Sequence, residues 1–140
     1  VHVADISSSP FWNGDSRIAR TYAGAALRGT SFRGTPTGFD HILSLGVTHV
    51  QLMPVFDFES VDENRLHDAS YANRLVGGKF NWGYDPENYS APEGSYSTDP
   101  RDGIVRIREL KALIKEFLAN GIGVIMDVTQ RASAKCSADT

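Results

Sequence analysis

The chain has 140 residues and a net charge of −3, with 41% hydrophobic and 22% charged residues. This balance is typical of one globular domain with its own core and excludes a disordered chain. Lysine and arginine form no cluster that could meet phosphates, so we expect no nucleic-acid binding and no membrane-surface binding. No apolar run approaches the ~20 residues of a membrane span. The single cysteine, Cys136, excludes an internal disulfide framework and a cysteine metal cluster.

The first residues, VHVADISSS, predict a strand that is already under way. Val1, Val3 and Ile6 are its apolar members, and we expect that further residues precede it. The stretch lacks the basic and apolar regions of a signal peptide. The compartment stays open on this basis, with the cytoplasm slightly favoured.

Two further apolar runs predict strands over residues 48–56 (THVQLMPVF) and 122–128 (IGVIMDV). The second of these is nearly continuous, which is typical of a parallel strand buried on both faces. A helix is expected to start at Thr35-Pro36 and to end at Gly46. A longer helix is expected from about Asp102 to Asn120. Its predicted apolar face consists of Ile104, Ile107, Leu110, Leu113, Ile114, Phe117 and Leu118.

The order strand, helix, strand, helix, strand predicts an α/β fold with a βαβαβ parallel sheet. Long insertions over residues 7–34 and 57–101 follow strand ends, which is where parallel α/β proteins bind ligands. We expect one domain over residues 1–128. The polar segment 129–140 has no periodicity and is expected to be a disordered tail.

Residues 80–100, FNWGYDPENYSAPEGSYSTDP, concentrate aromatic rings in a loop. Two prolines argue against a helix or a strand there, because each lacks a backbone donor. An aromatic ring matches the apolar face of a sugar, and carboxylates accept hydrogen bonds from sugar hydroxyls. A structural alternative, in which the rings pin the loop onto the fold, is about equally supported by the spacing. The residues concerned are Trp82, Tyr84, Tyr89, Tyr96, Asp85, Glu87 and Glu93, with Pro86 and Pro92.

Other chemistries find little support in the sequence. No G-x-G-x-x-G follows a strand, and Gly77-Gly78-Lys79 is followed by Phe80 where a phosphate loop needs serine or threonine. The histidines lack metal-ligand spacing, and no G-x-S-x-G nucleophile motif is present. We therefore expect no metal and no cofactor.

The stretch NWGYDPENYSAPEGSYSTDPRDG resembles the signature loop of type I pullulanases, debranching enzymes of the α-amylase family (glycoside hydrolase family 13). VHVADISSS, LGVTHVQLMPVFDFESVDE and RIRELKALIKEFLANGIGVIMDV resemble the first, second and third strand regions of that family. The resemblance covers about residues 1–128. It implies that the chain is the N-terminal part of a catalytic (β/α)8 TIM barrel, a partial barrel that covers about the first three strands. The implied reaction is retaining hydrolysis of α-1,6 linkages in pullulan, glycogen or starch by two carboxylates.

The resemblance also implies site residues. Tyr84 matches the tyrosine that stacks on the reacting sugar, and Asp127 matches the aspartate that orients an active-site arginine. Trp82 and Asp85, beside Tyr84, are the other predicted substrate-binding residues.

The chain departs from the family pattern after Asp127. The family continues Asp-Val-Val-Tyr-Asn-His, whereas this chain has Arg131 and Ala132 in place of the asparagine and histidine. No residue matches the catalytic carboxylates, so we expect a truncated chain that is inactive alone. The alternative is a non-catalytic α-glucan-binding fragment or a remnant.

Overall fold

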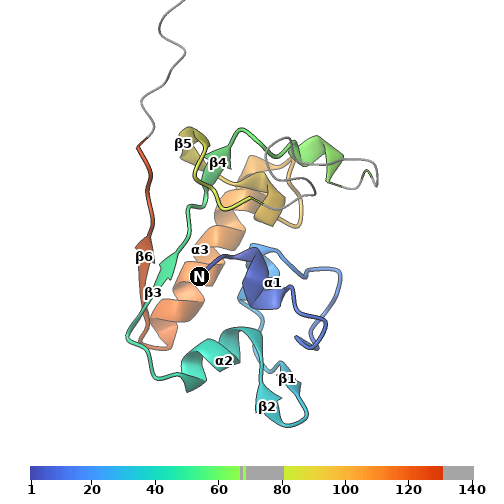
Figure 1. The fold of residues 1–140 in the computed structure, drawn as a ribbon, viewed down its shortest axis with the longest axis vertical. Helices are drawn as coiled ribbons and strands as arrows, with labels where there is room; N and C mark the ends of the chain where they lie inside the picture. The colour runs from blue at the N-terminus through green and yellow to red at the C-terminus, as the bar shows by residue number, and fades with distance from the viewer. Residues whose placement is uncertain (67, 69–80, 131–140) are drawn as a thin grey trace, which may run out of the picture.

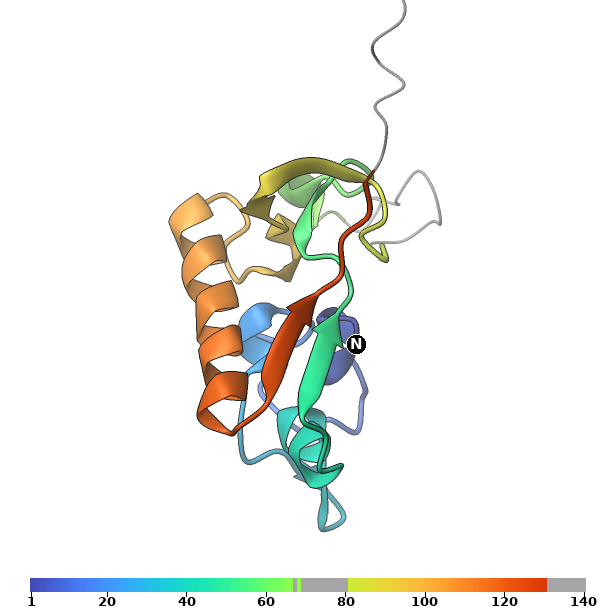
Figure 2. The same cartoon turned by 90° about the vertical axis from the view of Figure 1, so that its left-hand side faces the viewer.

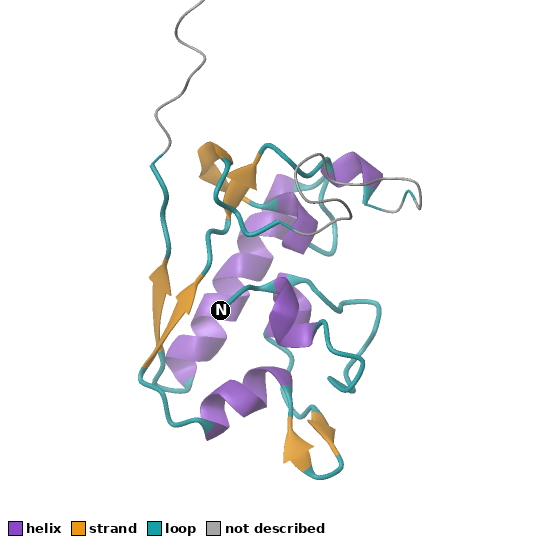
Figure 3. Ribbon diagram, viewed as in Figure 1, coloured by secondary structure: helices purple, strands orange, loops and turns teal. Residues whose placement is uncertain are grey.

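The computed structural model describes residues 1–66, 68 and 81–130. The chain is a small mixed α/β structure in which a long helix, α3, lies behind two parallel strands (Figures 1 and 2). Figure 3 shows how much of the remaining chain is loop or short element. The elements are η1 (Ala4–Ser7), α1 (Tyr22–Ala25), β1 (Ser31–Phe32), β2 (Thr35–Pro36), α2 (Gly38–Ser44), β3 (His49–Leu52), β4 (Phe56–Phe58), η2 (Glu63–Arg65), β5 (Pro86–Pro92), η3 (Gly94–Tyr96), α3 (Gly103–Ala119) and β6 (Gly123–Met126).

Strands β3 and β6 pair in parallel, from His49 opposite Gly123 to Leu52 opposite Met126. The crossover between them contains α3, so the predicted β–α–β unit is confirmed for this part of the chain. Both strands are shorter than the predicted runs. The run 48–56 divides into β3 and β4, with Pro54 between them.

The predicted first strand over residues 1–6 is wrong except at its first residue. The Val1 amino group donates to the Gln51 carbonyl at 2.5 Å, and the Val1 carbonyl accepts from the Met53 amide at 2.8 Å. This is the bonding pattern of a parallel neighbour on the other edge of β3. The chain then turns, because Val3 has helical angles and the short 3-10 helix η1 begins at Ala4.

The aromatic segment contains a strand, β5, that the prolines were expected to exclude. It pairs antiparallel with β4, and its first and last residues are Pro86 and Pro92. The register shifts between successive pairs, and proline is tolerated at strand ends and bulges because no ladder donor is needed there. The prediction of a loop without a strand was therefore wrong at this point.

The shorter helix starts later than predicted. Thr35-Pro36 forms strand β2 of a two-stranded hairpin, and α2 begins at Gly38 with Thr37 as its N-cap residue. The Thr37 hydroxyl donates to the Trp12 carbonyl at 2.6 Å, which ties this helix start to the N-terminal loop. The predicted end is confirmed, since Gly46 has a φ of +68° just beyond the helix.

Helix α3 follows the prediction closely in its bounds. Asp102 caps it by accepting from the Ile104 amide at 2.8 Å, and Gly121 follows its end with a φ of +76°. The predicted apolar face is too wide, because the two parallel strands cover only one side of the helix. Leu110, Leu113 and Phe117 are buried, whereas Ile104, Ile107 and Leu118 are exposed.

The core joins the two helices to the sheet. Phe39 of α2 and Phe117 of α3 are fully buried and stack with ring centroids 4.5 Å apart. Other buried members include Tyr22, Leu52 and Leu113. Among the described residues no helix is long and apolar enough to cross a membrane. His67, residues 77–80 and most of the predicted tail, residues 131–140, lie outside the described part of the chain.

Glu93 is a buried acidic residue at the start of η3. Its carboxylate accepts from the Phe58 amide at 3.1 Å and from the Ser95 amide at 2.7 Å. Burial raises its pKa to about 8 in spite of these donors. The prediction that Glu93 meets sugar hydroxyls is wrong, because its side chain lies inside the core.

Glu93 belongs to a group of acids with Asp57 and Glu63, whose nearest ligand oxygens lie within 4.8 Å of one another. The Arg106 guanidinium, on α3, pairs with Asp57 at 3.1 Å and with Glu63 at 3.0 Å. Burial is the main cause that raises the pKa of Glu63. Asp57, Glu63 and Arg106 therefore form an ion-pair cluster that attaches α3 to β4 and η2.

Replacing Phe117 with alanine should lower the free energy of unfolding by about 3–5 kcal/mol, because the change leaves a cavity against Phe39. Leu118→Ala is the matched control, since that side chain is 59% exposed and should change stability by less than about 0.5 kcal/mol. Urea unfolding followed by circular dichroism measures both. Equal losses in the two variants would contradict the observed orientation of α3.

The stability of the chain should fall as pH rises between about 4.5 and 8. The pKa of Glu93 is raised on folding, so its contribution is complete below the unfolded pKa and is lost as pH rises through about 8. Glu93→Gln should flatten this dependence and lower stability, because a carboxamide can accept from only one of the two backbone amides. Urea unfolding across this pH range is the measurement, with the exposed Glu87→Gln as control. An unchanged slope in Glu93→Gln would contradict this role.

Candidate functional site

Tyr84 and Asp127 lie side by side, although 43 positions separate them in the sequence. The Tyr84 hydroxyl donates to Asp127 Oδ2 at 2.8 Å. The Asp127 amide donates to the Leu52 carbonyl at 2.9 Å, so Asp127 continues the β6 pairing with β3 just beyond the strand. The hydrogen bond to Asp127 raises the pKa of Tyr84. Two of the four predicted site residues therefore meet at the carboxyl end of the parallel pair.

Tyr89 makes a second connection between the aromatic segment and the chain beyond β6. Its hydroxyl donates to the Thr129 carbonyl at 2.8 Å. Its ring packs against Phe56 with centroids 5.7 Å apart. Strand β5 is thus attached to β4 by backbone pairing and to the end of β6 by a tyrosine.

The rings of the aromatic segment divide into exposed and buried ones. Trp82 is 61% exposed and Tyr84 is 44% exposed, and Tyr89 is exposed as well. Tyr96 is buried, and its ring makes edge contacts with Tyr22 and Phe58. The structural alternative, in which a ring pins the segment onto the fold, thus holds for Tyr96 and in part for Tyr89, whereas Trp82 and Tyr84 are exposed at the surface.

Asp85 is placed differently from its neighbour Tyr84. It is 6% exposed, and its carboxylate accepts from Asn81 Nδ2 at 2.9 Å and from the Ser60 amide at 3.1 Å. The side chain therefore faces the interior of the turn. Glu87, the remaining acid of the predicted set, is exposed on β5.

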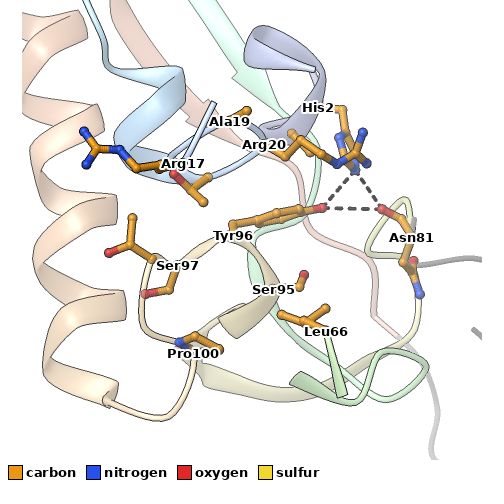
Figure 4. Close-up of a pocket in the computed structure, with 13 residues that line it drawn as sticks. His2, Arg17, Ala19, Arg20, Leu66, Asn81, Ser95, Tyr96, Ser97 and Pro100 are labelled. Carbon is orange, nitrogen blue, oxygen red and sulfur yellow. Dashed lines mark hydrogen bonds between the residues drawn. The ribbon is translucent and has the colours of Figure 1, made fainter. Parts of the chain in front are cut away.

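A cavity of about 240 Å³ lies beneath the N-terminus and was not predicted from the sequence (Figure 4). His2, Tyr96 and Asn81 form a triangle of hydrogen bonds in its wall. His2 Nε2 donates to the Asn81 carbonyl at 2.7 Å and lies 2.9 Å from the Tyr96 hydroxyl. Burial lowers the pKa of His2, which favours the neutral imidazole. His2 is therefore a buried, hydrogen-bonded part of the cavity wall.

Arg17 and Arg20 also line this cavity, with Ser95 and Ser97 on the opposite side (Figure 4). The Arg17 guanidinium pairs with Asp15, with a closest approach of 2.6 Å. None of Trp82, Tyr84, Asp85 and Asp127 lines the cavity. The cavity and the Tyr84–Asp127 surface are therefore built from different residues.

No protein-family model matches the chain, but several known proteins are similar to it. Pullulanase A of Streptococcus pneumoniae is 43% identical over 96 residues, which are 69% of this chain and 8% of that protein. The pullulanase of Bacillus subtilis is 43% identical over 95 residues, which are 68% of this chain and 12% of that protein.

Solved structures of pullulanases also resemble this chain. The pullulanase of Paenibacillus barengoltzii in complex with maltohexaose and α-cyclodextrin matches with a TM-score of 0.77 and 47% identity. That match covers 91% of this chain and 19% of the solved one. The pullulanase of Bacillus acidopullulyticus matches with a TM-score of 0.80 and 36% identity, over 98% of this chain and 16% of that one.

The chain thus spans less than a fifth of each relative named here, while most of its own length is matched. The similarity extends to the backbone arrangement as well as to the sequence. The chain belongs to the pullulanase family of glycoside hydrolases.

Proposed function

We propose that the chain is part of an enzyme that hydrolyses α-1,6 branch linkages in α-glucans such as pullulan, glycogen or starch. The observation that carries this proposal is the exposed Tyr84 ring, held by Asp127 at the carboxyl end of parallel strands. Ligands of parallel α/β enzymes bind at that end of the sheet. The pullulanase of Paenibacillus barengoltzii, a close structural match, was solved with maltohexaose and α-cyclodextrin. This supports an α-glucan as the ligand class.

The fold proposed for this segment is the first three strands of a (β/α)8 barrel. Val1, β3 and β6 lie side by side in the order of the sequence. Val1 bonds to β3 in the parallel pattern, and β3 pairs in parallel with β6. Helix α3 forms the crossover between β3 and β6, as a barrel requires. This arrangement and the similarity to pullulanase structures support the proposal.

Each predicted site residue takes a role that follows from its position. Tyr84 offers its ring face to a sugar, and the exposed Trp82 offers a second apolar surface two residues away. Asp127 holds the Tyr84 hydroxyl and so orients the ring. Asp85 shapes the turn from inside, since both of its carboxylate oxygens accept hydrogen bonds from the protein.

By itself the chain is proposed to bind glucan without cleaving it. Retaining hydrolysis needs two carboxylates ≈ 5–5.5 Å apart on either side of the scissile bond. Asp127 already accepts from Tyr84, and we propose that no other residue of the chain takes the place of the family's catalytic pair. The closely grouped acids Asp57 and Glu63 are paired with Arg106.

Tyr84→Ala should weaken the binding of maltohexaose by roughly tenfold, because a stacking surface worth about 1.4 kcal/mol is lost. Tyr84→Phe keeps the ring and removes only the hydrogen bond to Asp127, so it should weaken binding by roughly threefold. Isothermal titration calorimetry measures both. Phe11→Ala, at an exposed ring that packs on Phe32 in another part of the surface, is the control. Unchanged affinity in Tyr84→Ala would refute the stacking role.

The purified chain should release no reducing ends from pullulan above the level of a mock purification. The proposed reason is that this chain by itself lacks the pair of carboxylates that retaining hydrolysis requires. A reducing-sugar assay with pullulan measures this, and a full-length pullulanase is the positive control. Hydrolysis that is lost in the variant Asp127→Asn of the same preparation would show that the chain supplies a catalytic group of its own.

A further inference from the structure

The turn at residues 81–85 alternates between side chains that face solvent and side chains that face the protein. Trp82 and Tyr84 are exposed, whereas Gly83 and Asp85 are buried and Asn81 is half-buried. The exposed positions carry the rings of the proposed glucan site. The inward positions carry no ring, and they decide how the turn is attached.

The Asn81 side chain bonds to the turn on both sides of Tyr84. Its Oδ1 accepts from the Gly83 amide at 2.6 Å, which holds the residue before Tyr84. Its Nδ2 donates to Asp85 Oδ1 at 2.9 Å, which holds the residue after Tyr84. The same Nδ2 also donates to the Ser60 hydroxyl.

Further bonds connect this turn to the rest of the fold. Asp85 Oδ2 accepts from the Ser60 amide at 3.1 Å, and the Asp85 carbonyl accepts from the Glu59 amide at 3.1 Å. The Asn81 carbonyl accepts from His2 (Figure 4). The turn is therefore bonded to the segment after β4 and to the N-terminus.

Gly83 allows the turn to lie directly on the backbone of the preceding strand region. Its φ is +84°, and a Cβ at this position would lie 2.5 Å from the Pro54 carbonyl oxygen. A side chain is thus excluded on both conformational and steric grounds. The Gly83 amide is also the group that Asn81 Oδ1 holds, so the two residues act on the same peptide unit.

We propose that Asn81 is a positioning residue for the glucan site, and that it acts through its hydrogen-bonded pair with Asp85. The pair fixes the direction in which Tyr84 and Trp82 project, and neither Asn81 nor Asp85 touches the sugar. This inference rests on the proposed function of the Tyr84 surface. It differs from direct recognition, in which the Asp85 carboxylate itself accepts a sugar hydroxyl.

An exchange of the two side chains separates positioning from direct contact. Asn81→Asp sets two carboxylates against each other, and Asp85→Asn sets two amides against each other. The double variant N81D/D85N restores one donor and one acceptor between the two positions. In it, the new carboxylate can still accept from the Gly83 amide, and the new amide oxygen can still accept from the Ser60 amide.

Maltohexaose affinity should fall by about tenfold in each single variant and return to within about threefold of the wild type in the double variant. Calorimetric titration of the purified chain measures this. A double variant that binds as weakly as Asp85→Asn would overturn the proposal and indicate that the carboxylate contacts the sugar. The double variant decides the question even where a single one fails to fold, because it retains the hydrogen-bonding capacity of the native pair.

Acrylamide quenching of tryptophan fluorescence gives a second readout that needs no ligand. Trp12 is buried and Trp82 is exposed, so the quenchable emission reports on Trp82. Quenching should increase in the single variants and return to the native value in the double variant. An unchanged quenching profile in folded single variants would overturn the positioning role. If the wild type binds no maltohexaose, the proposed glucan site fails, and the quenching series still decides whether the pair positions the ring.

Discussion

The parallel register between β3 and β6 is the constraint on which the Tyr84 surface depends. Because the strands run in the same direction, their carboxyl ends meet at one edge, and the Asp127 amide extends the pairing to the Leu52 carbonyl. Asp127 is thereby held where the Tyr84 hydroxyl can reach it. A slip of one residue between the strands would turn the Asp127 side chain to the opposite face of the sheet.

Buried polar residues attach the aromatic segment to the rest of the fold. Glu93 accepts from two backbone amides, and Arg106 links α3 to the acids of β4 and η2. Asn81 and Asp85 do the same for the turn that carries Trp82 and Tyr84. A buried polar group that lacks a partner is costly, so these bonds strongly restrict the conformations that the segment can adopt. Trp82 and Tyr84 meanwhile lie exposed at the surface.

Tyr96 is buried, unlike Trp82 and Tyr84, because it contacts residues that are distant in the sequence. Tyr96 packs against Tyr22 and Phe58, and its hydroxyl lies 2.9 Å from His2 Nε2. It therefore holds the end of the segment inside the core, while Trp82 and Tyr84 lie at the surface. One aromatic segment thus serves both packing and the proposed recognition of glucan.

The sequence by itself determined the features whose signals are local. The Asp102 cap and Gly121 delimited α3, and Gly46 ended α2. The WGYD motif led to the family and to Tyr84 as a predicted site residue. Tertiary structure alone decided that Asp85 and Glu93 face inward, that Ile104 is exposed and that Pro86–Pro92 forms a strand. These outcomes depend on partners distant in the chain, such as His2 with Asn81, 79 positions apart. Local propensity and periodicity carry no information about which distant backbone group will satisfy a buried polar side chain.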